Sequence, residues 1–486
     1  MNSYLLNRAL GSVTPNEFHV AQTTRLVHNL EPAPGIRFSS RRAAAPTDRS
    51  EDDVAPLDQE LGVTAEVFAH KSGVNCLAVD QFEGRYMISG GADPSIHLWD
   101  LESRGSELEH VHQSCASVSK SSHADAHTHA ITSSSRSTRL TPSHQRSSRH
   151  HTMRYNRPLS PPIHTFNLDC TPYSHSFSSQ PGSTLLVAVG TSERSVRLVD
   201  LRSGLSTQGL PGHNGAVLSV AWAPHRPHLL ASASVDNRVI IFDVRRGGHN
   251  SAIATLDMDD PVGLVAPGTG SAPVSYDSRP AFSRHARAHN GPVTGVRWTS
   301  NGSHIVTTGQ DSRIRVWDSA TGANTLVHFG PRVRNGSSSH LAERAPLIVP
   351  RGSMSPGHET LLWPNFNEQD DRGEIFMFEL REGTFLKRLR VPGLAAGSQN
   401  IRGRSSALSA GRINDLVWRG NGASGEGIEL FSAHGDGTIR TWVSHEPDGE
   451  PTEAEQAAQA DRKRKRDVLD EIYQGFIGPD QPGLRI

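Results

Sequence analysis

Short stretches in which apolar and polar residues alternate recur along most of the chain. Val217-Leu-Ser-Val-Ala-Trp222 and Val293-Thr-Gly-Val-Arg-Trp298 are two of them. Alternation with a period of two is typical of a strand with one buried face, and the Gly, Asp and Asn residues between the stretches favour hairpin turns. Apolar runs reach about five residues, as at Leu185 to Val189, whereas a membrane helix needs roughly 20. The pattern predicts an all-β protein that is soluble and not tied to a membrane.

An acidic turn residue stands six positions before an aromatic residue, or before a residue that replaces it, in five of these units. The pairs are Asp93 and Trp99, Glu193 and Val199, Asp236 and Phe242, Asp311 and Trp317, and Asp436 and Trp442. Upstream, His70, His213 and His289 precede the aromatic residue by 29, 29 and 28 positions. A single match is easily accidental, but five with one spacing indicate a repeated unit.

The repeated residues can form a hydrogen-bond chain inside each unit. A His, a Ser or Thr, a Trp and the turn Asp would tie neighbouring strands together, and their burial is tolerated because each polar group finds a partner. Units of this kind are the signature of WD-repeat β-propeller blades. We therefore assign structural roles to His70, Asp93, Trp99, His213, Asp236, His289, Asp311, Trp317, Asp436 and Trp442.

The sequence divides into four parts. Residues 1–34 are predicted to form an N-terminal helix-loop-helix, 35–64 a linker, 65–443 the propeller, and 444–486 a polar tail. Six blades are recognisable, near 65–103, 163–204, 205–248, 284–322, 324–382 and 384–443.

The stretch 101–162 stands where a seven-bladed ring would need its second blade. Residues 132–162 are rich in Ser, Arg, His, Thr and Pro and show almost no alternation, yet the residues on both sides resemble blade ends. A genuine insertion is one explanation. A reading-frame or splice error that scrambles a blade is the other, and we favour it because the flanks keep their register. The sequence thus predicts seven blades with a degenerate or disrupted second blade, and the transcript sequence would decide between the two explanations.

Charge and residue chemistry argue against several classes of function. Lys plus Arg number 49 and Asp plus Glu 50, so the net charge is −1, and direct binding of nucleic acid is not favoured. Three scattered cysteines, Cys76, Cys115 and Cys170, are too few for a disulfide framework or a Cys-based zinc site. The eight His between 110 and 151 lie in a polar segment where no pair has a firm scaffold. No catalytic set or phosphate loop is recognisable, so we expect no enzyme activity, cofactor or metal.

Two short apolar helices are predicted before the propeller. Leu5 and Leu6 lie on one side of the first. Thr14-Pro15-Asn16-Glu17 has the sequence of a helix N-terminus and opens the second, where Phe18 and Leu26 supply apolar surface. These helices either pack on the ring or dock a partner, and the sequence does not choose between the two.

A basic cluster, Arg462-Lys-Arg-Lys-Arg466, lies in the C-terminal tail. Such a cluster is typical of a nuclear import signal or a nucleic-acid patch. A solvated helical turn is the plainer interpretation. The cluster is compatible with a location in the nucleus.

Two blades carry an Arg just after the strand that ends in Asp. The sequences are Asp200-Leu201-Arg202 and Asp243-Val244-Arg245, and the degenerate blade offers Glu379-Leu380-Arg381. An Arg at this place would stand at the rim of the ring, where its planar fork can bind carboxylates or carbonyls of a partner. A rim salt bridge worth roughly 0–1 kcal/mol is the structural alternative, but two in consecutive blades are less easily accidental.

Several blade segments resemble the Cockayne syndrome group A family of WD-repeat proteins. They are Glu83 to Asp93, Leu186 to Thr191, Leu230 to Val239, Phe242 to Arg246, and Gly322 to Val327. The resemblance covers 65–100 and 163–330 well, reaches the N-terminal helices and, more weakly, 375–443, and fails at 101–162 and in the basic tail.

The resemblance implies a substrate receptor of the cullin-4 ubiquitin ligase that acts in transcription-coupled nucleotide excision repair. Asp200, Arg202, Asp243 and Arg245 match its adaptor-binding boxes. The N-terminal helices, with Leu5, Leu6, Phe18 and Leu26, would add contacts to the damaged-DNA-binding protein 1 adaptor. The open face would meet a Cockayne syndrome B-like protein and stalled RNA polymerase II. A generic WD-repeat scaffold and a repair factor that binds nucleic acid through its tail are the alternatives.

Overall fold

The computed structural model of the chain describes residues 23–24, 26–40, 68–80, 84–104, 109–119, 131, 168–178, 186–203, 205–261, 286–330, 333, 344–349, 359–367, 372–391, 411–419 and 428–444. The chain divides into two compact units, Met1–Ser444 and His445–Ile486, and all described residues lie in the first. None of the helices in these ranges combines the length and the apolar character that a bilayer crossing demands. Leu5, Leu6, Phe18 and the cluster 462–466 lie outside the described residues.

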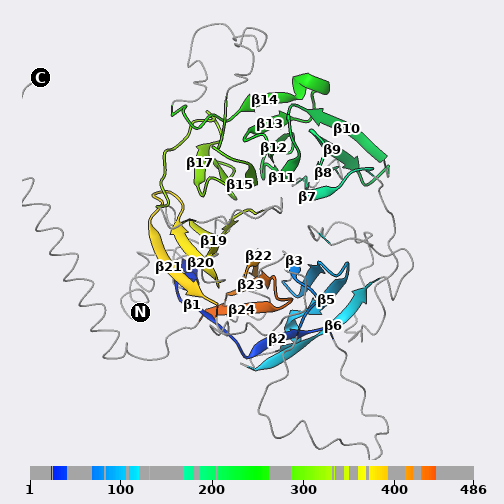
Figure 1. Cartoon of the computed structure of the whole chain (residues 1–486), viewed down its shortest axis with the longest axis vertical. Coiled ribbons are helices and arrows are strands. Elements are labelled where there is room, and N and C mark those ends of the chain that lie inside the picture. Colours follow the sequence, from blue (N-terminus) through cyan, green and yellow to red (C-terminus); the bar gives the residue numbers. More distant parts are fainter. Residues whose placement is uncertain are drawn as a thin grey trace, which may run out of the picture. The chain divides into compact units, whose positions relative to one another are not determined.

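The strands of these ranges form antiparallel sheets that follow one another along the chain (Figure 1). The first sheet contains β3 (Val74–Val79), β4 (Tyr86–Gly91), β5 (Ile96–Asp100) and β6 (His110–Val118), with β2 (Ile36–Ser39) at its edge. The second sheet contains β7 (Pro172–Phe177), β8 (Leu186–Thr191), β9 (Ser195–Asp200) and β10 (Leu205–Pro211). The third contains β11 (Val217–Trp222), β12 (Leu229–Ser234), β13 (Val239–Asp243) and β14 (Ala252–Thr255).

The second half of the chain repeats this arrangement. The fourth sheet contains β15 (Val293–Trp298), β16 (His304–Gly309) and β17 (Ile314–Asp318). The fifth contains β18 (Leu347–Ile348), β19 (Thr360–Asn367), β20 (Arg372–Glu379) and β21 (Phe385–Arg390). The sixth contains β22 (Ile413–Arg419), β23 (Glu429–His434) and β24 (Ile439–Ser444), with β1 (Leu30–Pro32) at its edge. Two 3₁₀ turns, η1 (Leu101–Arg104) and η3 (Gly248–Ser251), connect strands.

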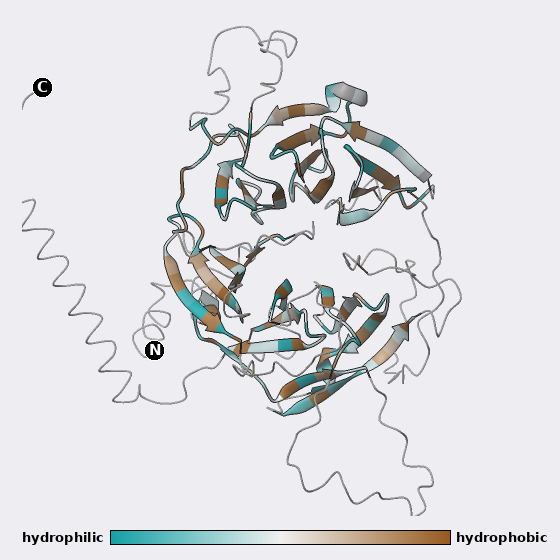
Figure 2. Cartoon of the chain, in the orientation of Figure 1, coloured by the Kyte–Doolittle hydropathy of each residue, from teal (hydrophilic) through white to brown (hydrophobic). Residues whose placement is uncertain are grey.

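Hydrophobic cores lie between consecutive sheets. One core joins the second sheet to the third, for instance Leu198 to Phe242, and others join third to fourth, fourth to fifth, fifth to sixth, and sixth to first. The buried third strand β13 is coloured mostly brown in Figure 2, whereas the outer strand β10 is paler. The third to sixth sheets therefore bury both faces against their neighbours, as in repeat proteins where stability comes from nearest-neighbour contacts.

The first and second sheets are the exception within the described residues. The core of Val187, Val189 and Val199 on the second sheet has no residue of another sheet in it. Ile131 nevertheless sits against the first sheet where a next blade would begin. Asn75 donates its side-chain amide to the Ile131 carbonyl at 2.9 Å, just as Asn414 donates to Val74 of the next sheet at 2.7 Å. The upstream flank of the irregular segment thus keeps blade register, while residues 132–167 lie outside the described ranges.

The N-terminal region differs from its prediction. Thr23–Thr24 and Leu26–His28 are helical, but Leu30–Pro32 forms β1, which pairs antiparallel with β24. Ile36–Ser39, predicted as linker, forms β2 and pairs in parallel with β6. The prediction was wrong here because both strands are short and are stabilised by partners distant in sequence, which local alternation does not reveal.

Two other predicted boundaries differ from those in the structure. The irregular stretch predicted to begin at 101 in fact opens with η1 and β6, which complete the first sheet. The fifth blade was predicted from 324, but Asn324 bridges to Trp317 and the Thr325 N–H donates to the Val316 carbonyl at 3.0 Å. These residues extend the edge of the fourth sheet. The predicted end of the propeller at 443 agrees within one residue with the end of β24.

Candidate protein-interaction site

The predicted hydrogen-bond chain is complete in the first and fourth sheets. In the first, the Trp99 indole N–H donates to Ser89 Oγ at 2.9 Å, Ser89 contacts His70 Nε2 at 2.7 Å, and His70 Nδ1 lies 3.0 Å from Asp93. The fourth repeats it with Trp317, Thr307, His289 and Asp311 at 2.8, 2.8 and 2.9 Å. These distances fit a Trp-to-hydroxyl-to-His-to-carboxylate order of donors. In both sheets the members of the predicted chain lie within hydrogen-bond distance of one another.

The third sheet has a shortened version of the chain. His213 Nε2 lies 2.6 Å from Ser232 Oγ and its Nδ1 lies 3.1 Å from Asp236. Phe242 takes the place of Trp, so the indole bond is absent, but its ring is fully buried. The third sheet thus forms with the buried Phe242 ring in place of the indole hydrogen bond.

The sixth sheet uses a histidine that the sequence reading missed. Trp442 donates to Ser432 at 3.0 Å, and Ser432 contacts His434 Nε2 at 2.8 Å, while Asp436 pairs with Arg440 at 2.9 Å. His434 stands two residues before the turn Asp, where the first and fourth sheets have Gly91 and Gly309. A Cβ on Gly309 would lie 2.5 Å from His289 Nδ1. In the first and fourth sheets the loop histidine lies against this Gly, in the third His213 is accommodated with Ser234 at the same position, and in the sixth the strand residue His434 itself bonds the Ser.

Burial and hydrogen bonding set the protonation of these networks. Burial alone would raise the pKa of Asp93 and Asp311, but the bonds from His70 and His289 bring both pKa values below their ordinary range. Desolvation lowers the pKa of His434 to about 3. These groups are held in one charge state inside the blades and serve the fold.

In several sheets the third strand ends in an Asp whose side chain accepts a hydrogen bond from the turn that follows. The residue two positions after Asp100, Asp200, Asp243 and Asp318 donates its backbone N–H to that Asp, at 3.1, 2.9, 3.1 and 2.9 Å. The turn itself is a local side-chain-to-backbone device. What distinguishes the second and third sheets is the residue at the second position, which is Arg in both.

Arg245 is clamped onto Asp243. Its Nε and Nη2 donate to the two carboxylate oxygens at 3.0 and 2.8 Å. Asp243 is buried with 5% of its side chain exposed, whereas the Arg245 side chain is 66% exposed. The hydrogen bond from Arg245 lowers the pKa of Asp243, and the pKa of Arg245 is raised in turn. The carboxylate holds the guanidinium in a fixed orientation at the surface. A partner that binds this guanidinium therefore loses little free energy to ordering of the Arg245 side chain.

Arg202 occupies the same turn position one blade earlier. Its backbone N–H donates to Asp200 at 2.9 Å, and its side chain is exposed. The carboxylate of Asp200 is only half-buried. The two predicted Arg residues thus share a backbone geometry at the ends of β9 and β13.

The two Arg turns belong to neighbouring, connected sheets. The Gln208 side-chain amide on β10 donates to the Arg246 carbonyl at 3.1 Å, next to Arg245. The Trp222 indole on β11 donates to the Ser176 carbonyl on β7 at 3.0 Å. Figure 1 shows both sheets adjacent in the green part of the chain. Arg202 and Arg245 therefore stand at corresponding ends of β9 and β13 on two blades fixed to each other.

Leu26 is the one predicted N-terminal contact residue that the structure describes. It is half-buried and packs against the core between the fifth and sixth sheets, where Val27 and Leu30 are fully buried. Lys387 Nζ donates to the carbonyls of His28 and Leu30 at 3.3 and 3.1 Å. This end of the predicted helix packs on the ring, which leaves Leu5, Leu6 and Phe18 as the candidates for docking.

The described ranges hold no group of three or more His, Cys, Asp or Glu side chains arranged to bind a metal ion. Among the described residues, Cys76, Cys115 and Cys170 form no disulfide. The candidate site is the surface around Arg202 and Arg245, where Asp243 orients the Arg245 side chain.

The model of the WD domain, G-beta repeat, matches residues 62–100, 204–243 and 282–318. These segments end at the closing Asp of β5, β13 and β17. The chain contains WD repeats at these three places. Its predicted all-β, WD-repeat propeller class is confirmed by these repeats and by the succession of antiparallel sheets.

Curated proteins are similar to about half of the chain, and one of them has WD repeats in its name. WD repeat-containing protein ATCSA-1 of Arabidopsis thaliana is 28% identical over 319 residues, 54% of this chain and 70% of the relative. Ribosome biogenesis protein ytm1 of Aspergillus fumigatus is 27% identical over 271 residues, 52% of this chain and 53% of the relative. The Podospora anserina protein YTM1 is 25% identical over 295 residues, 54% and 57% of the two chains. The WD-repeat chain spans little more than half the length of these two fungal relatives.

Proposed function

We propose that this WD-repeat protein is the substrate-receptor subunit of a cullin-4 RING ubiquitin ligase that acts in transcription-coupled nucleotide excision repair. The observation that carries the proposal is the Arg245 side chain, held on buried Asp243 and exposed at the end of β13. Arg202 repeats the position on the neighbouring sheet. The proposed role is to bind and present proteins, and ubiquitin transfer belongs to other subunits.

Arg245 has the donors that such a contact needs. A guanidinium carries five N–H groups, of which Asp243 engages two. Among the described contacts three remain for an acceptor on the partner. Because the fork is pre-oriented, an adaptor carboxylate or carbonyl can bind it with little loss of side-chain freedom. Neutral overall charge also suits a protein-binding surface better than one for nucleic acid.

Similarity to ATCSA-1 supports the same assignment, since the abbreviation CSA in its name is that of Cockayne syndrome A. The similarity covers 70% of that relative. By extension, the partners are the damaged-DNA-binding protein 1 adaptor, a Cockayne syndrome B-like protein and the stalled RNA polymerase II machinery. The location is the nucleus, with 462–466 as the import signal.

A role in ribosome biogenesis is the second candidate, favoured by the similarity to the fungal ytm1 proteins. Their identity is nearly the same as that of ATCSA-1, but the matched part covers a smaller share of each relative. Purification of the tagged chain from cells distinguishes the two. Ribosomal precursor RNA in the eluate, without the adaptor, would favour the second candidate.

The experiment that tests the proposal is a pull-down of the full chain with the purified adaptor. Deletion of 1–34 is unsuitable because it removes β1 and the buried Val27 and Leu30. The triple variant Leu5→Ser, Leu6→Ser, Phe18→Ser keeps them. Leu386→Ser, at an exposed site on β21, is the matched control.

We expect the wild-type chain and Leu386→Ser to retain the adaptor and the triple variant to lose most of it. The melting temperature should be the same for all three. A folded wild-type chain that retains no adaptor would overturn the ligase assignment. Equal retention of the adaptor by the triple variant would show that Leu5, Leu6 and Phe18 do not contribute to binding. The adaptor-binding surface would then consist of Arg202 and Arg245 alone.

A further inference from the structure

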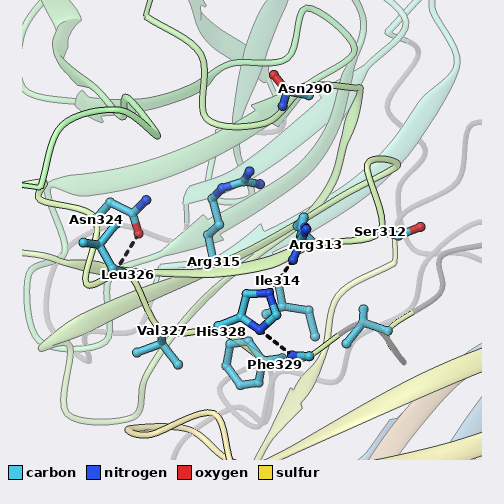
Figure 3. A pocket seen from close by; sticks show the side chains of 12 residues that line it. Asn290, Ser312, Arg313, Ile314, Arg315, Asn324, Leu326, Val327, His328 and Phe329 are labelled. Carbon is cyan, nitrogen blue, oxygen red and sulfur yellow. Dashed lines mark hydrogen bonds between the residues drawn. The ribbon is translucent and has the colours of Figure 1, made fainter.

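A pocket of about 340 Å³ lies at the opposite end of the strands from the Asp-x-Arg turns. It is formed at the start of β17 by the β16–β17 turn and the segment after β17. Its ionisable side chains are those of Arg313, Arg315 and His328, and its apolar lining includes Ile314, Leu326 and Phe329 (Figure 3). Arg202 and Arg245 follow β9 and β13 at the ends of those strands, so this pocket is a separate surface.

Arg315 shows how the chain itself satisfies an Arg–His pair. Its Nη1 lies 2.6 Å from His289 Nδ1, and Asp311 accepts from both residues, at 2.8 Å from Arg315 and 2.9 Å from His289. The carboxylate lies where two donors converge. This cluster is a blade network and is complete.

Arg313 forms the same pairing without an acid. Its Nη1 lies 2.6 Å from His328 Nε2, and the Gly330 N–H points at His328 Nδ1 at 3.0 Å. A neutral imidazole has one acceptor nitrogen and one N–H. It can therefore accept from only one of Arg313 and Gly330, and in the other contact two N–H donors face each other. In the described part of the chain no Asp or Glu bonds the Arg313 guanidinium or the His328 ring, and Asp311 accepts only the Arg313 backbone N–H, at 3.2 Å. The place that Asp311 fills in the neighbouring cluster is open to a carboxylate from outside.

An exposed apolar side chain stands on the rim of this pocket. Leu326 is 66% exposed, more than any other large hydrophobic residue among those described. Its φ of 60° lies in the left-handed region, which a branched side chain rarely adopts. Asn324 holds it there by accepting the Leu326 N–H at 3.1 Å and donating to the Met258 carbonyl at 2.9 Å. The chain thus fixes an apolar group beside two unmatched donors.

We propose that this pocket binds a segment of a partner protein that carries an Asp or Glu next to an apolar residue. The carboxylate accepts from Arg313 and His328, in the role that Asp311 has toward Arg315 and His289. The neighbouring apolar side chain packs on Leu326 and the pocket wall at Ile314 and Phe329. Charge complementarity and apolar exposure at one place select this ligand over a purely anionic or purely apolar one.

The test uses the full chain on an array of acetylated hexapeptides that contain Asp or Glu beside Leu, Ile or Phe, flanked by Gly. Matched peptides replace the acid by Asn or Gln, the apolar residue by Ala, or the acid by phosphoserine. Arg313→Ala removes the guanidinium, and Arg313→Lys keeps the charge but not the fork. Arg226→Ala, at an exposed site in the turn before β12, is the control for a general loss of positive charge.

Capture of the acidic–apolar peptides should fall at least tenfold when either half of the motif is replaced. It should fall as much in Arg313→Ala, partly in Arg313→Lys, and not in Arg226→Ala. The double variant Arg202→Ala, Arg245→Ala should bind these peptides normally, while Arg313→Ala should bind the adaptor normally. Equal capture of the Asn or Gln peptides, capture of phosphoserine peptides alone, or unchanged capture by Arg313→Ala would overturn the proposal.

Discussion

The side-chain amide of Gln208 donates to the backbone carbonyl of Arg246 at 3.1 Å, and this bond links the second sheet to the turn that presents Arg245. It is a connection between blades, beyond the hydrogen bonds within each sheet. The bond therefore joins the blade that carries Arg202 to the turn that carries Arg245.

The first prediction concerns this link. Gln208→Ala should lower the free energy of unfolding by about 1 kcal/mol, the usual worth of one hydrogen bond. It should also weaken adaptor binding by less than the loss of Arg245 does, because the Asp243 clamp remains. Urea titration and calorimetric binding measure the two effects. Adaptor affinity that falls as far as in Arg245→Ala would mean that the link, and not the guanidinium, controls binding.

The second prediction concerns glycine in the fourth sheet. Gly309→Ala should destabilise the chain by roughly 1–3 kcal/mol, because its Cβ would overlap His289 Nδ1 and Asp311 Oδ1, at 2.5 and 2.7 Å. Gly247→Ala is the control: a Cβ there meets nothing within 4 Å, and its φ of −87° suits any residue. Thermal denaturation should separate the two variants by several degrees. Equal melting temperatures would contradict the overlap of a Cβ at position 309 with the His289–Asp311 pair.

The third prediction is a pH dependence of stability that arises from His434. Its folded pKa of about 3 lies below its ordinary value of 6.5, so below about pH 6.5 the unfolded chain takes up a proton that the folded chain does not. Stability is therefore fully present above pH 6.5 and declines as the pH falls, by about 2 kcal/mol between pH 7 and pH 5 from this residue alone. His97 and His112, with pKa values lowered to about 4 by burial, add to the decline.

His434→Gln should flatten that decline by the stated amount, although it changes the stability at pH 7 as well. His225→Gln, at an exposed site, should leave the slope as it is. Urea unfolding at pH 7, 6 and 5 gives the slopes. A slope that His434→Gln leaves unchanged would show that His434 is not held neutral.

The fourth prediction tests whether Ile131 holds a fixed place on the first sheet. Asn75→Ala and Asn414→Ala each remove one side-chain bond to the opening residue of the next blade. Both should cost about 1 kcal/mol of unfolding free energy. A loss in Asn414→Ala alone would mean that Ile131 contributes nothing, and that the blade register ends before the irregular segment.

Spacing within the sequence predicted the blade networks, because their members are close together in the chain. His70 with Asp93 and Trp99, and His289 with Asp311 and Trp317, could be named from the repeat alone. His434 was missed because it replaces a loop residue from the strand, which changes the spacing. The strands β1 and β2 were missed because their partners, β24 and β6, are far away in sequence.

The candidate site was predictable only in part. The Asp-x-Arg pattern gave Arg202 and Arg245, but nothing in the sequence distinguished the Asp243 clamp on Arg245 from the turn at Arg202. The pocket at Arg313 and His328 was not predicted at all. It depends on the path of residues 324–330 beside the β16–β17 turn and on a left-handed Leu, which no propensity indicates.

The measurement that tests the central claim most directly is the affinity of the full chain for the purified adaptor by isothermal titration calorimetry. It compares wild type with Arg202→Ala, Arg245→Ala, the double variant, Arg245→Lys and the control Arg226→Ala. The double variant should bind at least about tenfold more weakly, as expected for oriented Arg residues at an interface, with an unchanged melting temperature. Arg245→Lys should recover only part of the loss. Equal affinity of the double variant and wild type would contradict the claim that these two Arg residues form the adaptor-binding surface.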